Sequence, residues 1–339
     1  MASHFVWLNR SKESLTLNLK RGEAIAILDR LLARADVFLN NLAPGAVDRL
    51  GVDAGTLRRK YPRLISCVIS GYGSSGPHQN QKAYDLLVQA EAGLLSVTGS
   101  AETPCKVGIS IADIAGGMYA FSGTLAALIT RGKTGAGATI EVSLLEALGE
   151  WMSYPALYTK YGGAPPPRTG ASHATIAPYG PFAGGDGSLV YLGVQNEREW
   201  TKFCEQVLER AELALDARFD SNANRVANRL ALHALIDAVF QRLTGPQIIE
   251  RLRLAQIANA RMNTIEEFLE HPQLGARHRW RQIDSPVGPL WTLIPPVDTD
   301  NVEPRMSPVP ALGEHSESIL KELGFDSDSI AGLQRTGVI

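Results

Sequence analysis

Asp113 is the residue of this chain whose type and setting best fit covalent chemistry. Gly108 precedes it and Gly116 and Gly117 follow it, so the backbone around its carboxylate carries little side-chain bulk. A carboxylate so placed can act as a nucleophile in acyl transfer, provided that the site is dry and that donors stabilise the oxyanion. The competing interpretation is that Asp113 only caps the helix that follows it. The two roles are compatible, and the spacing permits the first without requiring it.

Other patterns that could carry chemistry are weak. Gly132-Lys133-Thr134 looks like the end of a phosphate-binding P-loop, but Ala127 stands where that motif needs its first glycine. The predicted order of helix, turn and strand around it is also the reverse of a P-loop's. The histidines are scattered and the three cysteines lie far apart, so no metal-binding spacing occurs. We therefore predict no metal site and no nucleotide hydrolysis.

Alternating helices and strands must position Asp113. Apolar periodicity predicts helices over 21–32, 46–60, 84–95 and 114–130, and apolar runs predict strands over 36–39, 64–70 and 139–144. Val107, Ile109 and Ile111 alternate as a further strand. This pattern places Asp113 at a strand-to-helix junction, where ligands collect in parallel sheets because helix N-termini point there.

The pattern changes after residue 165. A glycine- and proline-rich stretch, 162–167, predicts a break. The chain beyond it has a strand over 189–194 and helices over 197–207, 229–243 and 246–258, and after the proline-rich stretch 295–310 it is helical again over 314–323 and 327–333. We predict an α/β fold in which a large Rossmann-like domain with a parallel sheet combines 1–165 and 295–339, with a smaller α+β domain inserted at 166–294.

Composition favours a soluble enzyme. The chain has 339 residues, 45% of them hydrophobic, and a formal net charge of -2, so it offers no bulk positive charge for nucleic acid or an anionic membrane. No charged-then-apolar leader begins the sequence, and the longest apolar stretch, 118–130, is short for a bilayer span. We expect a cytoplasmic protein with neither a nucleic-acid nor a membrane partner.

Several short motifs follow one another in a characteristic order. They are the segments 8–12, 35–37, 44–46, 69–73, 84–90 and 312–315, together with Asp113 and its glycines. Each motif is weak alone, but their order over nearly the whole chain resembles the class III CoA-transferases, of the CaiB/BaiF type, and the related α-methylacyl-CoA racemases. The resemblance implies an interlocked homodimer whose second subunit helps to close the active site. It also implies an acyl-CoA and a carboxylic acid as substrates, with no permanently bound cofactor.

The resemblance also implies roles for single residues. Asp113 falls on the family's catalytic aspartate, which forms a mixed anhydride with the acyl group and then a thioester with CoA. The residues that resemble the family's CoA contacts are Leu17, Lys20, Asn41, Leu42, Ala46, Arg49, Lys82 and Tyr84. The cations in this set suit the phosphates of CoA. Asp85 falls where the family often has an acidic residue near the active site.

Two alternatives stay open. A racemase of the same superfamily needs an acid–base pair, and its usual histidine falls at Tyr84, although a tyrosine hydroxyl is a poor base at neutral pH. An inactive CoA-binding homologue is the second, because the family normally begins with a further strand and helix that carry additional CoA and active-site contacts. The stretch 162–182 resembles members that act on small dicarboxylates such as succinate, mesaconate or itaconate.

Overall fold

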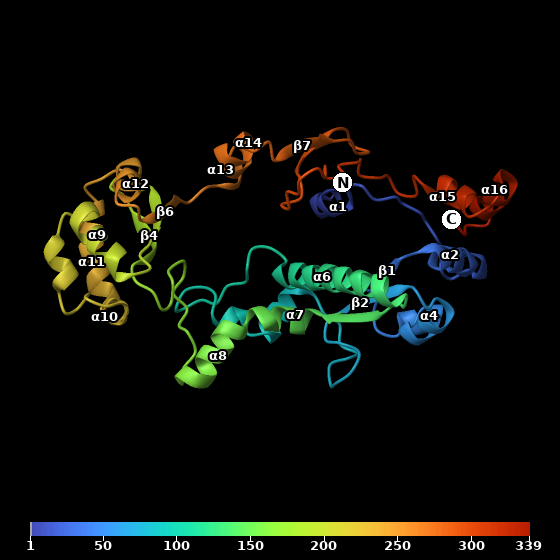
Figure 1. Cartoon of the computed structure of the whole chain (residues 1–339), viewed down its shortest axis with the longest axis horizontal. Helices are drawn as coiled ribbons and strands as arrows, with labels where there is room; N and C mark the ends of the chain where they lie inside the picture. Colours follow the sequence, from blue (N-terminus) through green and yellow to red (C-terminus); the bar gives the residue numbers. More distant parts are fainter. Residues whose placement is uncertain (1) are drawn as a thin grey trace. The chain divides into compact units, whose positions relative to one another are not determined.

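The first half of the chain alternates helices with short strands (Figure 1). The computed structural model describes residues 2–339. The elements of this half are α1 (Ser3–Asn9), α2 (Gly22–Arg34), β1 (Val37–Asn40), α3 (Ala46–Leu50), α4 (Ala54–Lys60), β2 (Ile65–Ser70), α5 (Asp85–Glu91), a short 3-10 helix (Leu94–Ser96), α6 (Ile111–Thr134), β3 (Thr139–Ser143), α7 (Leu144–Trp151) and α8 (Ser153–Gly162). Strands β1 and β2 pair in parallel, from Val37 opposite Ile65 to Asn40 opposite Val68, and β3 lies on the other side of β2. The predicted α/β class with a parallel sheet is confirmed.

The second half contains an antiparallel sheet and a separate hairpin. The sheet has the order β4 (Tyr179–Ala183), β5 (Leu189–Gly193), β6 (Ala258–Arg261). Around it lie α9 (Glu197–Lys202), a π-helical turn (Phe203–Val207), a 3-10 helix (Ala211–Leu215), α10 (Asn222–Ala227), α11 (Arg229–Phe240) and α12 (Gly245–Leu254) (Figure 1). The remaining elements are α13 (Ile265–Leu269), α14 (Pro272–Ala276), the hairpin β7 (Trp280–Ile283) and β8 (Leu290–Leu293), α15 (Ser316–Glu322) and α16 (Ser327–Arg335).

The chain divides into two compact units. Unit 1 contains residues up to 68, 122–140 and 265–339, and unit 2 contains 69–121 and 141–264. Within unit 1, Leu320 of α15 and Ile330 of α16 are buried against Ala24 and Ile27 of α2, so the end of the chain packs on its first long helix. Within unit 2, a buried apolar cluster fills the space between the β4-β5-β6 sheet and its helices. The predicted domain boundaries at 165 and 295 stay predictions.

The strand predicted over 107–111 is wrong. Residues 107–110 form no strand, and α6 begins directly at Ile111. The alternating pattern misled the prediction, because Ile109 is 57% exposed and does not belong to a buried face. The Val107 N–H donates to the Gln89 side chain, not to a neighbouring strand. Asp113 therefore follows a loop, and the predicted strand-to-helix junction does not exist.

Several predicted helices have different bounds, and two of them show the cause. The helix expected over 46–60 is split into α3 and α4, because Gly51 adopts a left-handed conformation (φ 67°) that ends α3, and Asp53 caps α4 by accepting from the Thr56 N–H. The helix expected over 246–258 ends at Leu254, and Ala258 already belongs to β6. In both places a local turn interrupts an apolar pattern that is otherwise helical.

Helix α6 is longer than its apolar core suggests. It continues through Gly132 to Thr134 and ends before Gly135, whose φ is 74°. Among residues 2–339 it is the one helix long and apolar enough, by length and composition, to cross a bilayer, with a mean hydropathy of 1.3 in its most apolar window. Core helices of other proteins pass the same criterion, so the expected absence of a membrane partner stays a prediction.

A buried arginine organises the core of unit 2. Arg225 of α10 is 1% exposed, and its guanidinium donates to both carboxylate oxygens of Glu197, at 2.7 and 2.9 Å. It also donates to the carbonyls of Ala177 and Phe219 and lies over the ring of Trp200. Hydrogen bonding to Arg225 lowers the pKa of Glu197. One side chain thus ties α10 to α9 and to the segment before β4.

We predict that Arg225→Ala destabilises the protein by about 2–5 kcal/mol, because it leaves two buried carbonyls without a donor and opens a cavity beside Trp200. Urea unfolding followed by tryptophan fluorescence would measure this loss. Glu197→Gln is the matched control, since it keeps an acceptor for Arg225 and changes only an exposed partner. Equal stability of Arg225→Ala and the wild type would contradict the assigned role.

Candidate active site

Asp113 lies in the first turn of α6. Helix α6 begins at Ile111, so Asp113 is its third residue, and the first intrahelical bond runs from the Ile114 N–H to the Ser110 carbonyl. The backbone N–H groups of a first helical turn have no partner within the helix and create a positive end that favours negative charge. The Asp113 side chain is exposed to solvent. An anion or a developing oxyanion beside Asp113 would therefore meet a favourable field.

A second aspartate binds the same helix end. Asp85, the first residue of α5, accepts a hydrogen bond from the Ala112 N–H at 2.8 Å through Oδ1. Its Oδ2 accepts from Gln89 Nε2 at 2.7 Å, and Gln89 Oε1 accepts from the Val107 N–H at 3.0 Å. Gln89 is completely buried. These bonds join α5 to both ends of the loop that leads into Asp113.

Apolar packing supports the same position. Val88 of α5, Ala112 of α6 and Leu148 of α7 are buried together in one cluster, with Leu94 and Leu144 packed against it. The residue before Asp113 is therefore held in the core, while Asp113 itself faces outward. A buried residue followed by an exposed one thus fixes the backbone at Asp113 and leaves its side chain accessible.

The glycines near Asp113 have different roles. A Cβ at Gly108 or Gly117 would meet nothing within 4 Å, so these two positions leave space, as the sequence predicted. At Gly116 a Cβ would lie 2.5 Å from Leu144 Cδ2. Gly116 therefore does not leave open space beside Asp113, and the missing side chain instead permits close packing between α6 and the start of α7.

The environment of Asp113 makes its ionised form costly. Burial by the surrounding protein raises the pKa of its carboxyl group, and the negative charge of Asp85 raises it further. Because Asp85 takes the Ala112 N–H, that donor cannot stabilise the Asp113 carboxylate. The Asp113 carboxylate is thus less stable as an anion than the side chain of an isolated aspartate.

Lys82 and Tyr84 are held next to α5. Both side chains are exposed, and Tyr84 occupies the N-cap position of α5 without a capping hydrogen bond from its side chain. Gly71, just after β2, has no room for a Cβ because Ala83 packs directly on it. The structure therefore brings these two predicted CoA contacts together with Asp85 and Asp113 in unit 2.

The other predicted CoA contacts lie in unit 1. Lys20, Asn41, Leu42 and Arg49 are exposed, and Ala46 is half-buried. Leu17 packs against the apolar cluster of α2, α15 and α16, so its side chain serves the core. Nearby, at the end of β1, Asn40 is 8% exposed and its Nδ2 has no hydrogen-bond partner. Sequence patterns did not single out Asn40, because its distinctive feature is a buried amide nitrogen without a partner, which only the structure shows.

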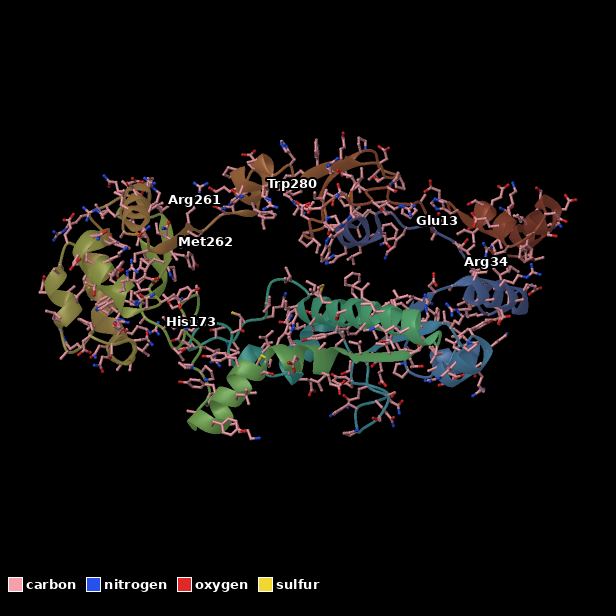
Figure 2. The ribbon with its side chains drawn as sticks, in the orientation of Figure 1. Glu13, Arg34, His173, Arg261, Met262 and Trp280 are labelled. Carbon is pink, nitrogen blue, oxygen red and sulfur yellow. The ribbon has the colours of Figure 1, made fainter. Side chains whose placement is uncertain are left out.

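The stretch 162–182, which resembles members that act on small dicarboxylates, is held by hydrogen bonds to backbone carbonyls of another loop. Arg168 donates to the carbonyls of Ser100 and Ala101 at 2.8 and 2.7 Å. His173, labelled in Figure 2, stacks on Tyr179 with ring centres 5.2 Å apart. Two of the guanidinium nitrogens of Arg168 thus hold a loop in place.

Metal and nucleotide motifs find no support in the part of the chain that the structure describes. No group of histidine, cysteine, aspartate and glutamate side chains could hold a metal ion there. Lys133, in the motif that looks like a P-loop, lies in the last turn of α6, where a cation suits the negative end of the helix.

Comparison with known proteins places these features in one family. A family model described as CoA-transferase family III matches residues 1–316. An acyl-CoA transferase from Fusarium pseudograminearum is 33% identical over 100% of this chain and 75% of its own length. A succinate–glutarate CoA-transferase from Agrobacterium fabrum is 31% identical over 95% of this chain and 81% of its own.

A solved structure agrees with these sequence matches. The crystal structure of a CaiB/BaiF family protein from Brucella suis superposes with a TM-score of 0.82 at 31% identity, covering 95% of this chain and 84% of the other. This chain therefore belongs to CoA-transferase family III.

Proposed function

We propose that the protein transfers CoA from an acyl-CoA to a small dicarboxylic acid, with Asp113 as the covalent carrier. The observation that carries this proposal is the setting of Asp113 at a helix N-terminus, where it is accessible to solvent yet partly desolvated and lies beside the negative charge of Asp85. A nucleophile that is destabilised while ionised is well suited to form neutral acyl intermediates.

The proposed reaction proceeds in balanced steps. A carboxylate oxygen of Asp113 attacks the thioester carbon, the C–S bond breaks, and CoA leaves as a thiolate. The thiolate then attacks the Asp113 carbonyl of the anhydride, which releases the donor acid and leaves an aspartyl-CoA thioester. The acceptor carboxylate attacks that thioester, and the thiolate finally attacks the acceptor's acyl carbon, which frees Asp113. Water is not consumed, so the site must exclude it from the intermediates.

A dicarboxylate is the proposed acceptor. The relative from Agrobacterium fabrum is named for succinate and glutarate, which are both dicarboxylic acids. The second carboxylate of such a substrate needs a cation or backbone donors, and Arg168 uses two of its nitrogens on carbonyls of the Ser100–Ala101 loop. We therefore propose Arg168 as a loop anchor, not as the group that binds the acceptor.

We predict that incubation with succinyl-CoA and hydroxylamine modifies the protein at Asp113 alone, because hydroxylamine intercepts the aspartyl thioester. Intact-mass spectrometry and peptide mapping would locate the adduct. Asp113→Ala should form none and should lose at least about a thousandfold in turnover. Glu91→Gln, at the exposed end of α5, is the matched control and should label as the wild type does.

Three outcomes of this experiment separate the candidate functions. An adduct at Asp113 that requires no free acid to form, followed by transfer to succinate or glutarate, supports the transferase. Exchange of the substrate's α-proton without an adduct would indicate a racemase. Binding of CoA with neither adduct nor exchange would indicate an inactive homologue.

The exposed cations of unit 1 are proposed contacts of the CoA phosphates. Lys20 and Arg49 fall on predicted CoA contacts, and both are solvent-exposed. Leu17 stays a predicted CoA contact, with a partly buried side chain that packs against the core of α2, α15 and α16. Charge-assisted bonds to phosphate are about twice as strong as neutral ones, so each cation should matter for affinity.

We predict that Lys20→Gln raises the KM for acyl-CoA by about tenfold with little change in kcat, because a bond to a charged group contributes about 1.5–3 kcal/mol. Steady-state kinetics with varied acyl-CoA would measure it. Lys321→Gln, which removes an exposed lysine paired with Glu317 on α15, is the control. An equal effect of both variants would show that only overall charge matters.

A homodimer is the proposed assembly. Large apolar side chains remain exposed along consecutive helices, among them Phe121 (60%) of α6, Trp151 (45%) of α7 and Tyr161 (77%) of α8. Exposed apolar surface of this kind usually marks an interface. The resemblance to interlocked dimers names a second copy of the chain as the partner that covers it.

We predict that sedimentation velocity gives twice the mass of a single chain, and that Phe121→Lys shifts the protein toward monomer because it places a charge in an apolar interface. Leu230→Lys is the matched control, since Leu230 is 88% exposed on the surface of α11, a helix that packs on the antiparallel sheet through other residues. A monomeric wild type at micromolar concentration would refute the dimer.

A further inference from the structure

Asp85 and Gln89 form a connected pair beside Asp113 whose bonds all end on the segment that carries it. Asp85 accepts from the Ala112 N–H, and Gln89 accepts from the Val107 N–H. The bond between the two side chains, 2.7 Å long, links one attachment to the other. The loop between Val107 and Ala112 is therefore held at both ends by one helix, α5.

Burial makes this connection stiff. Gln89 and Ala112 are 0% exposed, and Val88 on the same helix belongs to the apolar cluster with Ala112. A buried amide with both its oxygen and its nitrogen bonded is costly to disturb, because any rotation leaves a polar atom unsatisfied. The loop therefore resists movement without any strand to hold it.

We propose that Asp85, supported by Gln89, is a positioning residue for Asp113, which fixes the start of α6 through the Ala112 N–H and places a negative charge beside the nucleophile. The proposal rests on the proposed function, since it assigns Asp85 a role in the aspartyl chemistry of Asp113. Asp85 itself touches no reacting atom in this scheme. It acts through the backbone and through its charge.

The electrostatic part follows from the sign of the charges. Asp85 is negative, so it repels the Asp113 carboxylate and adds to the burial that raises the pKa of Asp113. Once Asp113 is joined to an acyl group or to CoA it is neutral, and this repulsion is gone. Asp85 therefore favours the covalent intermediates over the free carboxylate.

The other charged side chains on the elements around Asp113 either bond to other groups or are exposed to solvent. Lys106, in the loop before α6, donates to the Val107 carbonyl. On α7, Glu146 accepts from Ser143, and Glu150 is exposed. On α5, Glu91 is exposed at the opposite end of the helix from Asp85. Asp85 is the charged group that acts on the pKa of Asp113.

Two substitutions separate position from charge. Asp85→Asn removes the charge and keeps an oxygen that can accept from the Ala112 N–H, but its amide nitrogen then faces Gln89 Nε2, so the bond to Gln89 is lost as well. Gln89→Leu keeps the charge and most of the volume but removes the bond to the Val107 N–H. Gln89→Leu also loses the bond between the two side chains with the charge kept, so the difference between the two variants reports the charge. Glu91→Gln removes a charge from the same helix without touching this network and serves as the control.

The experiment measures the rate of the Asp113 adduct from succinyl-CoA as a function of pH. The reaction needs ionised Asp113, so the rate falls as pH drops through its raised pKa. Without the charge of Asp85 the pKa of Asp113 falls, so in Asp85→Asn the acid limb, the fall in rate at low pH, should move to lower pH. The fraction of protein trapped as aspartyl-CoA should also decrease. Gln89→Leu should keep the acid limb and lose about 10- to 100-fold in rate, because a small misplacement of the nucleophile has that cost.

Thermal unfolding of each variant checks that it is folded. An Asp85→Asn protein that is folded and shows the wild-type acid limb and the wild-type adduct fraction would overturn the role assigned to Asp85. A Gln89→Leu protein with the wild-type rate would overturn the supporting role of Gln89. The wild type measured alongside separates the two proposals, since the absence of any adduct there refutes the covalent role of Asp113 itself, and this inference with it.

Discussion

The unpaired N–H groups at the start of α6 are the constraint on which the site depends. A helix end must satisfy these donors, and Asp85 takes the one at Ala112 with a carboxylate from another helix. Asp113, the next residue, is thereby denied that partner and is left exposed at the positive end of the helix. Its pKa is raised by burial first and by Asp85 second. The need to satisfy the Ala112 N–H therefore brings in the carboxylate of Asp85, whose charge raises the pKa of Asp113.

This arrangement suits covalent transfer better than proton transfer. A general base should hold its proton-accepting form near neutral pH and needs a partner acid, and the resemblance places Tyr84 at the position of the racemase branch's histidine. A nucleophilic carboxylate instead benefits from an environment in which neutralisation is favourable. Repulsion by Asp85 provides this whether the neutral form is an anhydride or a thioester.

Sequence patterns predicted the parts of this site that depend on residue type, and missed those that depend on contacts between distant segments. Asp113 and the helix after it could be found because an acidic residue precedes a long apolar run. The strand expected over 107–111 was wrong because alternation does not reveal burial, and Ile109 is exposed. Gln89 left a faint signal, a polar residue placed i,i+4 from Asp85 in an apolar helix, but only the fold shows that it bonds Val107.

Steric and polar contacts locate Asp113 from two directions. On one side Asp85 holds the residue before it, and on the other Gly116, one turn later, lets α6 approach Leu144 so closely that even a Cβ would collide. A hydrogen bond alone would leave the helix free to rotate about it, and close packing alone would leave the first turn free to fray. Because both act within one turn of the same helix, the carboxylate of Asp113 can remain solvent-accessible while its backbone is fixed, a combination that the proposed attack on a thioester requires.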